Sequence, residues 1–291
     1  MTEMPSSTEA TVTVPEPRAS RARSIVLRTK GHTHGFITRL MSPGDLGELV
    51  KPFVFLDYFH AENFTGPGMA VHPHSGIATH TTLLSGRSTY EDSTGKSGVL
   101  PEQSVEWMQA GGGVWHGGKP VAGDTIRGYQ LWIALPQSLE HAPAESHYID
   151  PESIEGDAHI RVLLGAYGAL KSPIPYHEPL TYLHVRLADG ERWRFSPPQG
   201  HDVAWVATHR GKLQVAGVTL EREMAVFDEG SGEIEFSAVG ETELLVGSAQ
   251  KHPHPLVCGY YSVHTSEAAL VRGEAGIREI ASTSSRGRAT P

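Results

Sequence analysis

Three histidines offer the clearest chemistry in this sequence. His72 and His74 stand in the segment Val-His-Pro-His-Ser-Gly, and His116 stands in Gly-Gly-Gly-Val-Trp-His. Because successive side chains alternate across a β-strand, His72 and His74 share one face if their segment is extended. A returning strand can then bring His116 beside them. Three converging imidazoles predict a site for one divalent metal ion, and histidine ligands alone do not select which metal binds.

The elements that would position these histidines are short strands. Residues 77–84 and 105–110 are strand-like runs that lie between the two histidine segments. Apolar runs and turns alternate in the same way over residues 24–135 and 180–250, a rhythm typical of β-sandwiches and β-barrels. We therefore expect an all-β protein with two similar β-barrels. A single short helix, capped by Ser266, is expected near the C-terminus.

The chain divides into four expected parts. These are a disordered tail at residues 1–23, an N-terminal barrel with the metal site at 24–150, a C-terminal barrel with the terminal helix at 151–281, and a second disordered tail at 282–291. Both tails are polar, so they bury too little apolar surface to offset the entropy of ordering. Within the first barrel, residues 24–29 are expected to pair with residues 36–40.

Composition excludes several classes of function. The 24 Lys and Arg against 33 Asp and Glu give a net charge of −9, which argues against a nucleic-acid groove. Cys258 is the only cysteine, so no internal disulfide can form. The sequence has no apolar run of about 18 residues and no apolar signal-peptide core in residues 1–22. We expect a cytoplasmic protein without a membrane partner.

The motifs of the first half resemble the pirin family of the cupin superfamily. The resemblance covers about residues 25–280 and is specific in the first barrel. Its motifs are Pro52-Phe-Val-Phe-Leu-Asp-Tyr-Phe, His72-Pro-His-Ser-Gly, Tyr90-Glu-Asp-Ser-Thr-Gly, Val105-Glu-Trp-Met-Gln-Ala-Gly-Gly-Gly-Val-Trp-His and Tyr129-Gln-Leu-Trp-Ile-Ala-Leu-Pro.

This resemblance implies a bicupin, which is two stacked antiparallel β-barrels of the jelly-roll type, with one mononuclear metal in the N-terminal barrel. Fe(II) is the ion that the family implies, with Zn, Ni, Cu or Mn as alternatives. Some members of the family are quercetin 2,3-dioxygenases, which open a flavonol ring with O₂ and release carbon monoxide. Others are redox-sensitive co-regulators or bind metabolic enzymes, so the resemblance leaves both a small aromatic substrate and a protein partner open.

The family's ligand positions transfer only in part. Its two HPH histidines correspond to His72 and His74, and its third histidine corresponds to His116. The family's fourth ligand is a glutamate two residues after its third histidine, and this chain has Gly118 at that position. At a second position, where the family has an acidic residue, this chain has Ala78. The sequence therefore lacks a charged ligand and the group best suited to act as a base. Strand parity predicts that a glutamate introduced at position 118 would point toward the metal.

Four further residues have both a functional and a structural interpretation. His80 has the strand parity of the HPH histidines and could replace the missing ligand, although six residues of strand span about 20 Å; the alternative is a core histidine. Tyr90, Trp107 and Trp115 could line the substrate pocket or fill the barrel.

Other motifs favour structural roles. The pattern His252-Pro-His-Pro repeats the HPH motif but precedes no returning strand, which favours a turn. The glycine run at residues 111–113 favours a close backbone approach near a strand end.

Two functions remain at this point. One is a metal-dependent dioxygenase of the quercetinase type, and the other is a non-catalytic pirin-like regulatory or protein-binding module with a weak or empty metal site.

Overall fold

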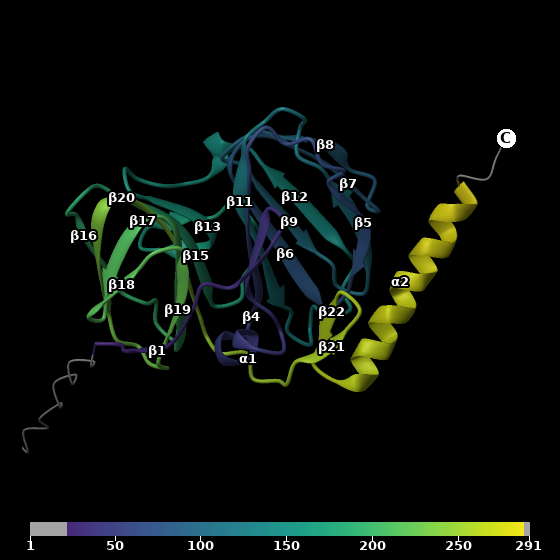
Figure 1. Ribbon diagram of the computed structural model, residues 1–291. Coiled ribbons are helices and arrows are strands. Elements are labelled where there is room, and N and C mark those ends of the chain that lie inside the picture. The colour runs from purple at the N-terminus through teal and green to yellow at the C-terminus, as the bar shows by residue number, and fades with distance from the viewer. Residues whose placement is uncertain (1–21, 288–291) are drawn as a thin grey trace, which may run out of the picture.

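The chain folds into two β-barrels that lie side by side, followed by one long helix, in a computed structural model that describes residues 22–287 (Figure 1). All strand pairs within the sheets are antiparallel in this described range, as the short runs and frequent turns predict. The first barrel closes around two sheets of seven and four strands. The second barrel is built from one nine-stranded sheet.

The strands of the first barrel follow two sheet orders. The seven-stranded sheet runs β12 (Glu145–Ile149), β9 (Val105–Gln109), β6 (Ile77–Ser85), β11 (Ile126–Ala134), β4 (Phe53–Ala61), β3 (Ile37–Met41) and β2 (His32–His34). The four-stranded sheet runs β5 (Met69–His74), β10 (Val114–Gly118), β7 (Ser88–Asp92) and β8 (Ser97–Leu100).

The second barrel and the connecting elements complete the chain. The nine-stranded sheet runs β1 (Ile25–Thr29), β19 (Glu223–Phe227), β17 (Val203–Val215), β20 (Ile234–Ala249), β15 (Leu180–Leu187), β13 (Ile160–Tyr167) and β14 (Leu170–Lys171), with β16 (Arg192–Phe195) on β20 and β18 (Val218–Leu220) on β17. The other elements are α1 (Leu46–Val50), a 3₁₀ turn (Pro151–Ser153), the hairpin β21 (Val257–Gly259) and β22 (Ser262–His264), and α2 (Glu267–Gly287).

The first strand of the described chain belongs to the second barrel, and the C-terminal segment packs on the first barrel. The expected hairpin of residues 24–29 with 36–40 is wrong, because β1 pairs with β19 of the second barrel and β3 pairs with β2 and β4. Figure 1 shows β1 (purple) beside the green strands of the second barrel, and the yellow C-terminal segment against the first. Gly31, at φ +72°, turns the chain from one barrel to the other.

Side-chain alternation along β11 separates two different interiors. Leu131 and Ile133 enter a large apolar core shared between the barrels, whereas Trp132 points into the first barrel and stacks on Phe55. An apolar cluster that includes Phe236 fills the second barrel. Alternation thus gives the sheet of the first barrel one face in the shared core and one face in its own interior.

Helix α2 packs through glycine. Ser266 caps it as predicted, accepting a hydrogen bond from the backbone N of Ala269 at 3.2 Å. A Cβ on Gly276 would lie 2.2 Å from the carbonyl oxygen of Gly112, which confirms the close approach expected at the glycine run.

None of the helices in the described range is both long and apolar enough to cross a membrane.

Parts of the two expected tails are ordered. Arg23 is buried, and its guanidinium donates to the carbonyl oxygens of Asp228 (2.7 Å) and Asp202 (3.0 Å). Helix α2 continues to Gly287, so the beginning of the segment expected as a C-terminal tail is helical. Residues 1–21 and 288–291 lie outside the described range, and the expectations for them remain predictions.

Neutral histidines lie where the two barrels meet. Burial lowers the pKa of His80 to about 4, that of His184 to about 3 and that of His209 to about 4. Nearby arginines lower the pKa of His184 further, while Glu243 opposes them. Each ring is therefore uncharged at neutral pH.

Acidification is expected to destabilise this interface. The unfolded chain, whose histidine pKa is about 6.5, binds these protons more readily than the folded protein does. The stability due to the neutral rings is complete above about pH 6.5 and is lost as the pH falls toward about 4. Each histidine adds a slope of up to about 1.4 kcal/mol per pH unit to the free energy of unfolding. Urea unfolding at a series of pH values measures this slope.

Replacing His184 by leucine removes one titrating group and should make the slope shallower. Replacing the exposed His34 by glutamine is the matched control and should leave the slope unchanged. An unaltered slope in His184→Leu would show that this ring does not couple stability to pH.

Candidate metal centre

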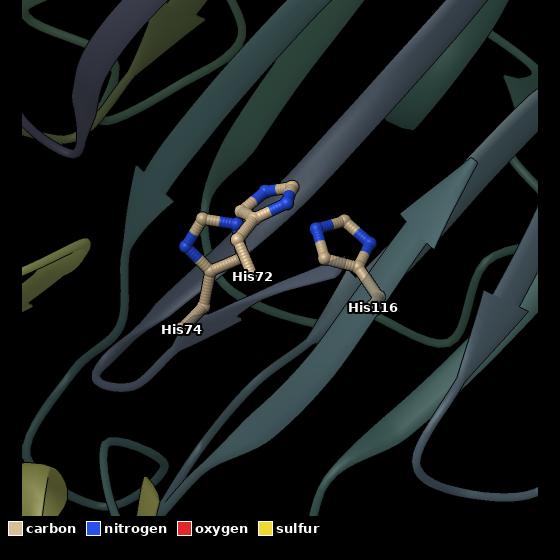
Figure 2. A group of neighbouring side chains, drawn as sticks. All are labelled: His72, His74 and His116. Carbon is tan, nitrogen blue, oxygen red and sulfur yellow. The ribbon is translucent and has the colours of Figure 1, made fainter. Parts of the chain in front are cut away.

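The register of two strands brings the three histidines together. On paired strands β5 and β10, His116 lies directly opposite His72, and Val114 lies opposite His74. Ring centroids are 4.7 Å apart for His72 and His116, 4.8 Å for His72 and His74, and 5.0 Å for His74 and His116. Figure 2 shows the three rings turned toward a common point. The structure thus places His72, His74 and His116 in the arrangement that the sequence predicted.

Each ring is oriented by a hydrogen bond on Nδ1. Nδ1 of His72 lies 2.9 Å from the carbonyl oxygen of Ala70, and Nδ1 of His74 lies 2.9 Å from that of Tyr261. Since a carbonyl oxygen only accepts, these Nδ1 atoms carry the proton and leave the Nε2 lone pairs available.

The donor atoms of these rings fit one metal ion. They all lie within 4.8 Å of one another, so a small inward movement gives the separations of about 3–3.5 Å that a metal–nitrogen distance of about 2.0–2.1 Å requires. Nε2 of His116 is buried and has no hydrogen-bond partner in the described structure. A buried nitrogen without a partner is costly, and a metal would satisfy it. The residues present therefore fit a single divalent ion.

Two of the three histidines can bind a metal without releasing a proton. Burial, reinforced by the neighbouring His116, lowers the pKa of His72 to about 4. Burial also holds the pKa of His74 well below its usual value, and His116 and His72 reinforce the effect. Both rings are neutral at pH 7, which is the form that coordinates a metal.

A buried carboxylate stands behind the third histidine. Glu106 on β9 accepts from Nδ1 of His116 at 3.1 Å and from the hydroxyl of Thr81 at 2.9 Å. Burial alone would raise the pKa of Glu106, but these hydrogen bonds outweigh burial and hold the pKa below its usual value. An ionised carboxylate on a ligating histidine fixes the ring and makes it a stronger ligand.

Sequence reasoning missed Glu106, although its position carried a signal. Glu106 precedes Trp107 on the same strand, and Trp107 belongs to the shared core. Alternation then requires Glu106 to face the interior of the first barrel.

The structure corrects the expectation for position 118. A Cβ on Gly118 would lie 2.1 Å from the carbonyl oxygen of Thr89 on the adjacent strand β7. The register of β5 and β10 also shifts between His116 and Gly118. A glutamate introduced here would collide with backbone before it could reach the metal. Ala78, the second departure from the family pattern, belongs to the shared core.

His80 lies outside the histidine cluster. Its Nε2 is 3.3 Å from the carbonyl oxygen of Leu163, and its Nδ1 is 3.2 Å from the hydroxyl of Thr82. Its ring packs edge-to-face on Tyr182 of the second barrel. Alternation along β6 is the cause, since it turns His80 toward the shared core. The structure therefore favours the core interpretation over a metal-binding role.

The three aromatics expected at a substrate pocket are dispersed. Trp107 is buried in the shared core, and Trp115 donates from Nε1 to the carbonyl oxygen of Ile277 at 3.0 Å, on the side facing α2. Tyr90 lines an open depression of about 540 Å³ at the β5, β7, β8 and β10 edge, but none of the three histidines lines it.

His252 lies in a loop before β21, as the turn interpretation predicted.

Other aromatic rings surround the histidines. The ring of Trp132 lies 4.9 Å from that of His74 and stacks on Phe55 at 4.1 Å. The ring of Tyr261 lies 5.3 Å from that of His72 and 5.8 Å from that of His74. Trp132 belongs to the motif that begins at Tyr129. No residue near Tyr261 in the sequence indicates that its ring lies beside histidines nearly two hundred positions earlier.

Two antiparallel barrels, with three converging histidines in the first, define the chain as a bicupin with a candidate metal site. The family model described as Pirin matches residues 36–133. A Pseudomonas aeruginosa protein named as a candidate quercetin 2,3-dioxygenase is 31% identical over 243 residues, covering 78% of this chain and 84% of that protein. A pirin-like protein of Caulobacter vibrioides is 32% identical over 222 residues, covering 70% of this chain and 76% of its own length. The chain belongs to the pirin family.

A solved structure agrees with this assignment. The crystal structure of a quercetin 2,3-dioxygenase from Acinetobacter baumannii matches with a TM-score of 0.79 at 26% identity, covering 88% of this chain and 96% of the other. The likeness extends over both barrels, and it supports the fold independently of the sequence motifs.

We expect Glu106→Gln to weaken metal binding. The amide of glutamine carries no negative charge beside His116. Loss of a charged partner of a ligating histidine typically lowers metal affinity about 10- to 100-fold. Titration of the apo-protein with Co(II), followed by its visible absorption, measures the change. Glu102→Gln, at an exposed position, is the control. Equal affinities in the two variants would show that Glu106 does not support the metal.

We expect Gly118→Glu to lower thermal stability without raising metal affinity, because its side chain meets the backbone of Thr89. Gly44→Glu is the control, since a Cβ on Gly44 meets nothing within 4 Å. Differential scanning calorimetry and the same Co(II) titration measure the two effects. Tighter metal binding by a stable Gly118→Glu protein would contradict the geometry described above.

Proposed function

We propose that this protein is a metal-dependent dioxygenase of the quercetinase type, acting on flavonol-like substrates. The observation that carries the proposal is the convergence of three imidazoles beside the rings of Trp132 and Tyr261. A planar substrate with two neighbouring oxygens suits such a site, because it can chelate an ion and lie against aromatic side chains. The likeness to relatives named as quercetin 2,3-dioxygenases supports the same substrate class.

The chain's own residues have separable roles in this proposal. His72, His74 and His116 would hold the ion, for which Fe(II) is our proposal. When bound, the ion would supply Lewis-acid chelation of the substrate oxygens and activate the substrate toward O₂. Glu106 orients His116, and it already accepts hydrogen bonds from His116 and Thr81. We therefore assign Glu106 to positioning the ligand rather than to removing the substrate's proton.

Metal analysis followed by a turnover assay tests this function. We expect apo-protein to bind one Fe(II) per chain under anaerobic conditions. Addition of quercetin and O₂ should then consume the flavonol and release carbon monoxide in equal amounts. His116→Ala should lose both the metal and the activity. Full Fe(II) occupancy without quercetin consumption would overturn the quercetinase proposal.

One observation favours the second candidate, a non-catalytic regulatory or protein-binding module. The group of donor atoms around the three histidines includes no carboxylate among the described residues, which weakens retention of a divalent cation. Purified protein that binds no metal at micromolar concentrations would support this candidate over the enzyme.

A further inference from the structure

Tyr261 reaches the metal centre from the far end of the chain. It lies in the turn between β21 and β22, yet its ring packs against both His72 and His74. Its carbonyl oxygen accepts the hydrogen bond from Nδ1 of His74 at 2.9 Å. Tyr261 is 40% exposed, so its ring contacts the ligands without being enclosed by the protein.

The backbone of Tyr261 is in a conformation that tyrosine disfavours. Gly259 pairs with Ser262, so Tyr260 and Tyr261 form a two-residue turn, and φ of Tyr261 is +55°. Glycine or asparagine normally occupies a turn position with positive φ. Such strain persists only where the surrounding structure holds it, and it occurs often at functional sites. The turn itself does not require tyrosine, so the ring needs another explanation.

A buried network fixes the hairpin to the metal-binding strand. Ser75, which follows His74, donates from Oγ to Oγ of Ser262 at 2.9 Å. Ser75 Oγ also lies 3.0 Å from Nε2 of His264, whose Nδ1 is 3.2 Å from a carboxylate oxygen of Glu140. The residue after the metal ligand and the residue after Tyr261 are therefore joined directly.

This serine–histidine–glutamate network has no access to a substrate. A Cβ on Gly273 of α2 would lie 2.2 Å from Nε2 of His264 and 2.6 Å from Oγ of Ser75. The helix backbone covers the reactive atoms, and all three side chains are buried. The network anchors the hairpin, and with it the ring of Tyr261.

We propose that Tyr261 is a specificity-determining residue of the metal centre. Its exposed ring supplies the surface on which a planar dihydroxyaromatic compound lies while its oxygens face the three histidines. This inference rests on the function proposed above. The ring suits the role because a half-exposed aromatic face beside the ligands gains by stacking on a second aromatic ring. Aliphatic chelators of the same metal would gain nothing from it.

The Tyr261→Gly variant tests the contribution of the ring separately from that of the backbone. Glycine keeps the carbonyl that orients His74 and relieves the positive φ, so folding and metal affinity should be retained. The probe is 4-nitrocatechol, whose visible absorption changes on chelation, added anaerobically to Fe(II)-loaded protein. We expect its Kd to rise about 2- to 13-fold in Tyr261→Gly, an effect typical of losing one stacking contact. The Kd for Fe(II) should stay within about twofold and Tm should not fall. Oxalate, a non-aromatic chelator, should bind both proteins equally.

Two further variants control for nonspecific effects. Tyr261→Phe keeps the ring and should bind the probe like the parent. Tyr260→Ala removes the neighbouring ring, which is 69% exposed, and should also leave binding unchanged.

Each other outcome overturns a defined statement. If Tyr261→Gly binds 4-nitrocatechol as tightly as the parent, the ring is not a substrate surface, and the proposed function is unaffected. If Tyr261→Gly loses Fe(II) affinity, the ring supports the ligands and the specificity role is wrong. If the Fe(II)-loaded parent binds no 4-nitrocatechol, the proposed function fails, and the inference about Tyr261 fails with it.

Discussion

Hydrogen bonds donated by three Nδ1 atoms are the constraint on which this site depends. An imidazole coordinates a metal only when the proton is on its other nitrogen and the ring points correctly. The three acceptors come from different parts of the chain: Ala70 on the same strand, Glu106 on β9, and Tyr261 on the C-terminal hairpin. The centre therefore forms only when both sheets of the first barrel and the last segment of the chain are in place.

The second barrel provides the platform for this arrangement. Its interior is filled by apolar side chains, and its outer face packs on the first barrel through the shared core. The seven-stranded sheet of the first barrel thus has one face buried against the second barrel and one face available for polar residues. Packing on the shared face supplies the hydrophobic stabilisation, which allows Glu106 and the histidines to be buried on the other face. Strand alternation assigns each residue to one of these two environments.

Local sequence information predicted much of the structure. The parity of His72 and His74, the strand rhythm, the Ser266 cap and the glycine run each depend on a few neighbouring residues, and the structure shows each of them. Strand parity could also have identified Glu106. Pairing between distant segments was beyond such reasoning: the position of β1 in the second barrel and of Tyr261 beside His74 depends on contacts about two hundred residues apart in the sequence. The error at Gly118 has the same origin, because the obstacle is the backbone of another strand, which parity within β10 does not describe.

The position of the carboxylate has consequences for chemistry at the centre. A carboxylate among the ligands would neutralise one charge of the ion and occupy one coordination position. Glu106 instead contacts the ring of His116, so its charge would still favour binding of a cation while every position beyond the three nitrogens would stay open. An ion that prefers six ligands then retains up to three positions, enough for a chelating pair of oxygens and one small molecule. The lack of the fourth ligand therefore does not by itself exclude a function at this site. Such a site would retain a metal less tightly. The neutral state of His72 and His74 would offset part of that loss, because no proton competes with the ion for these two rings near neutral pH.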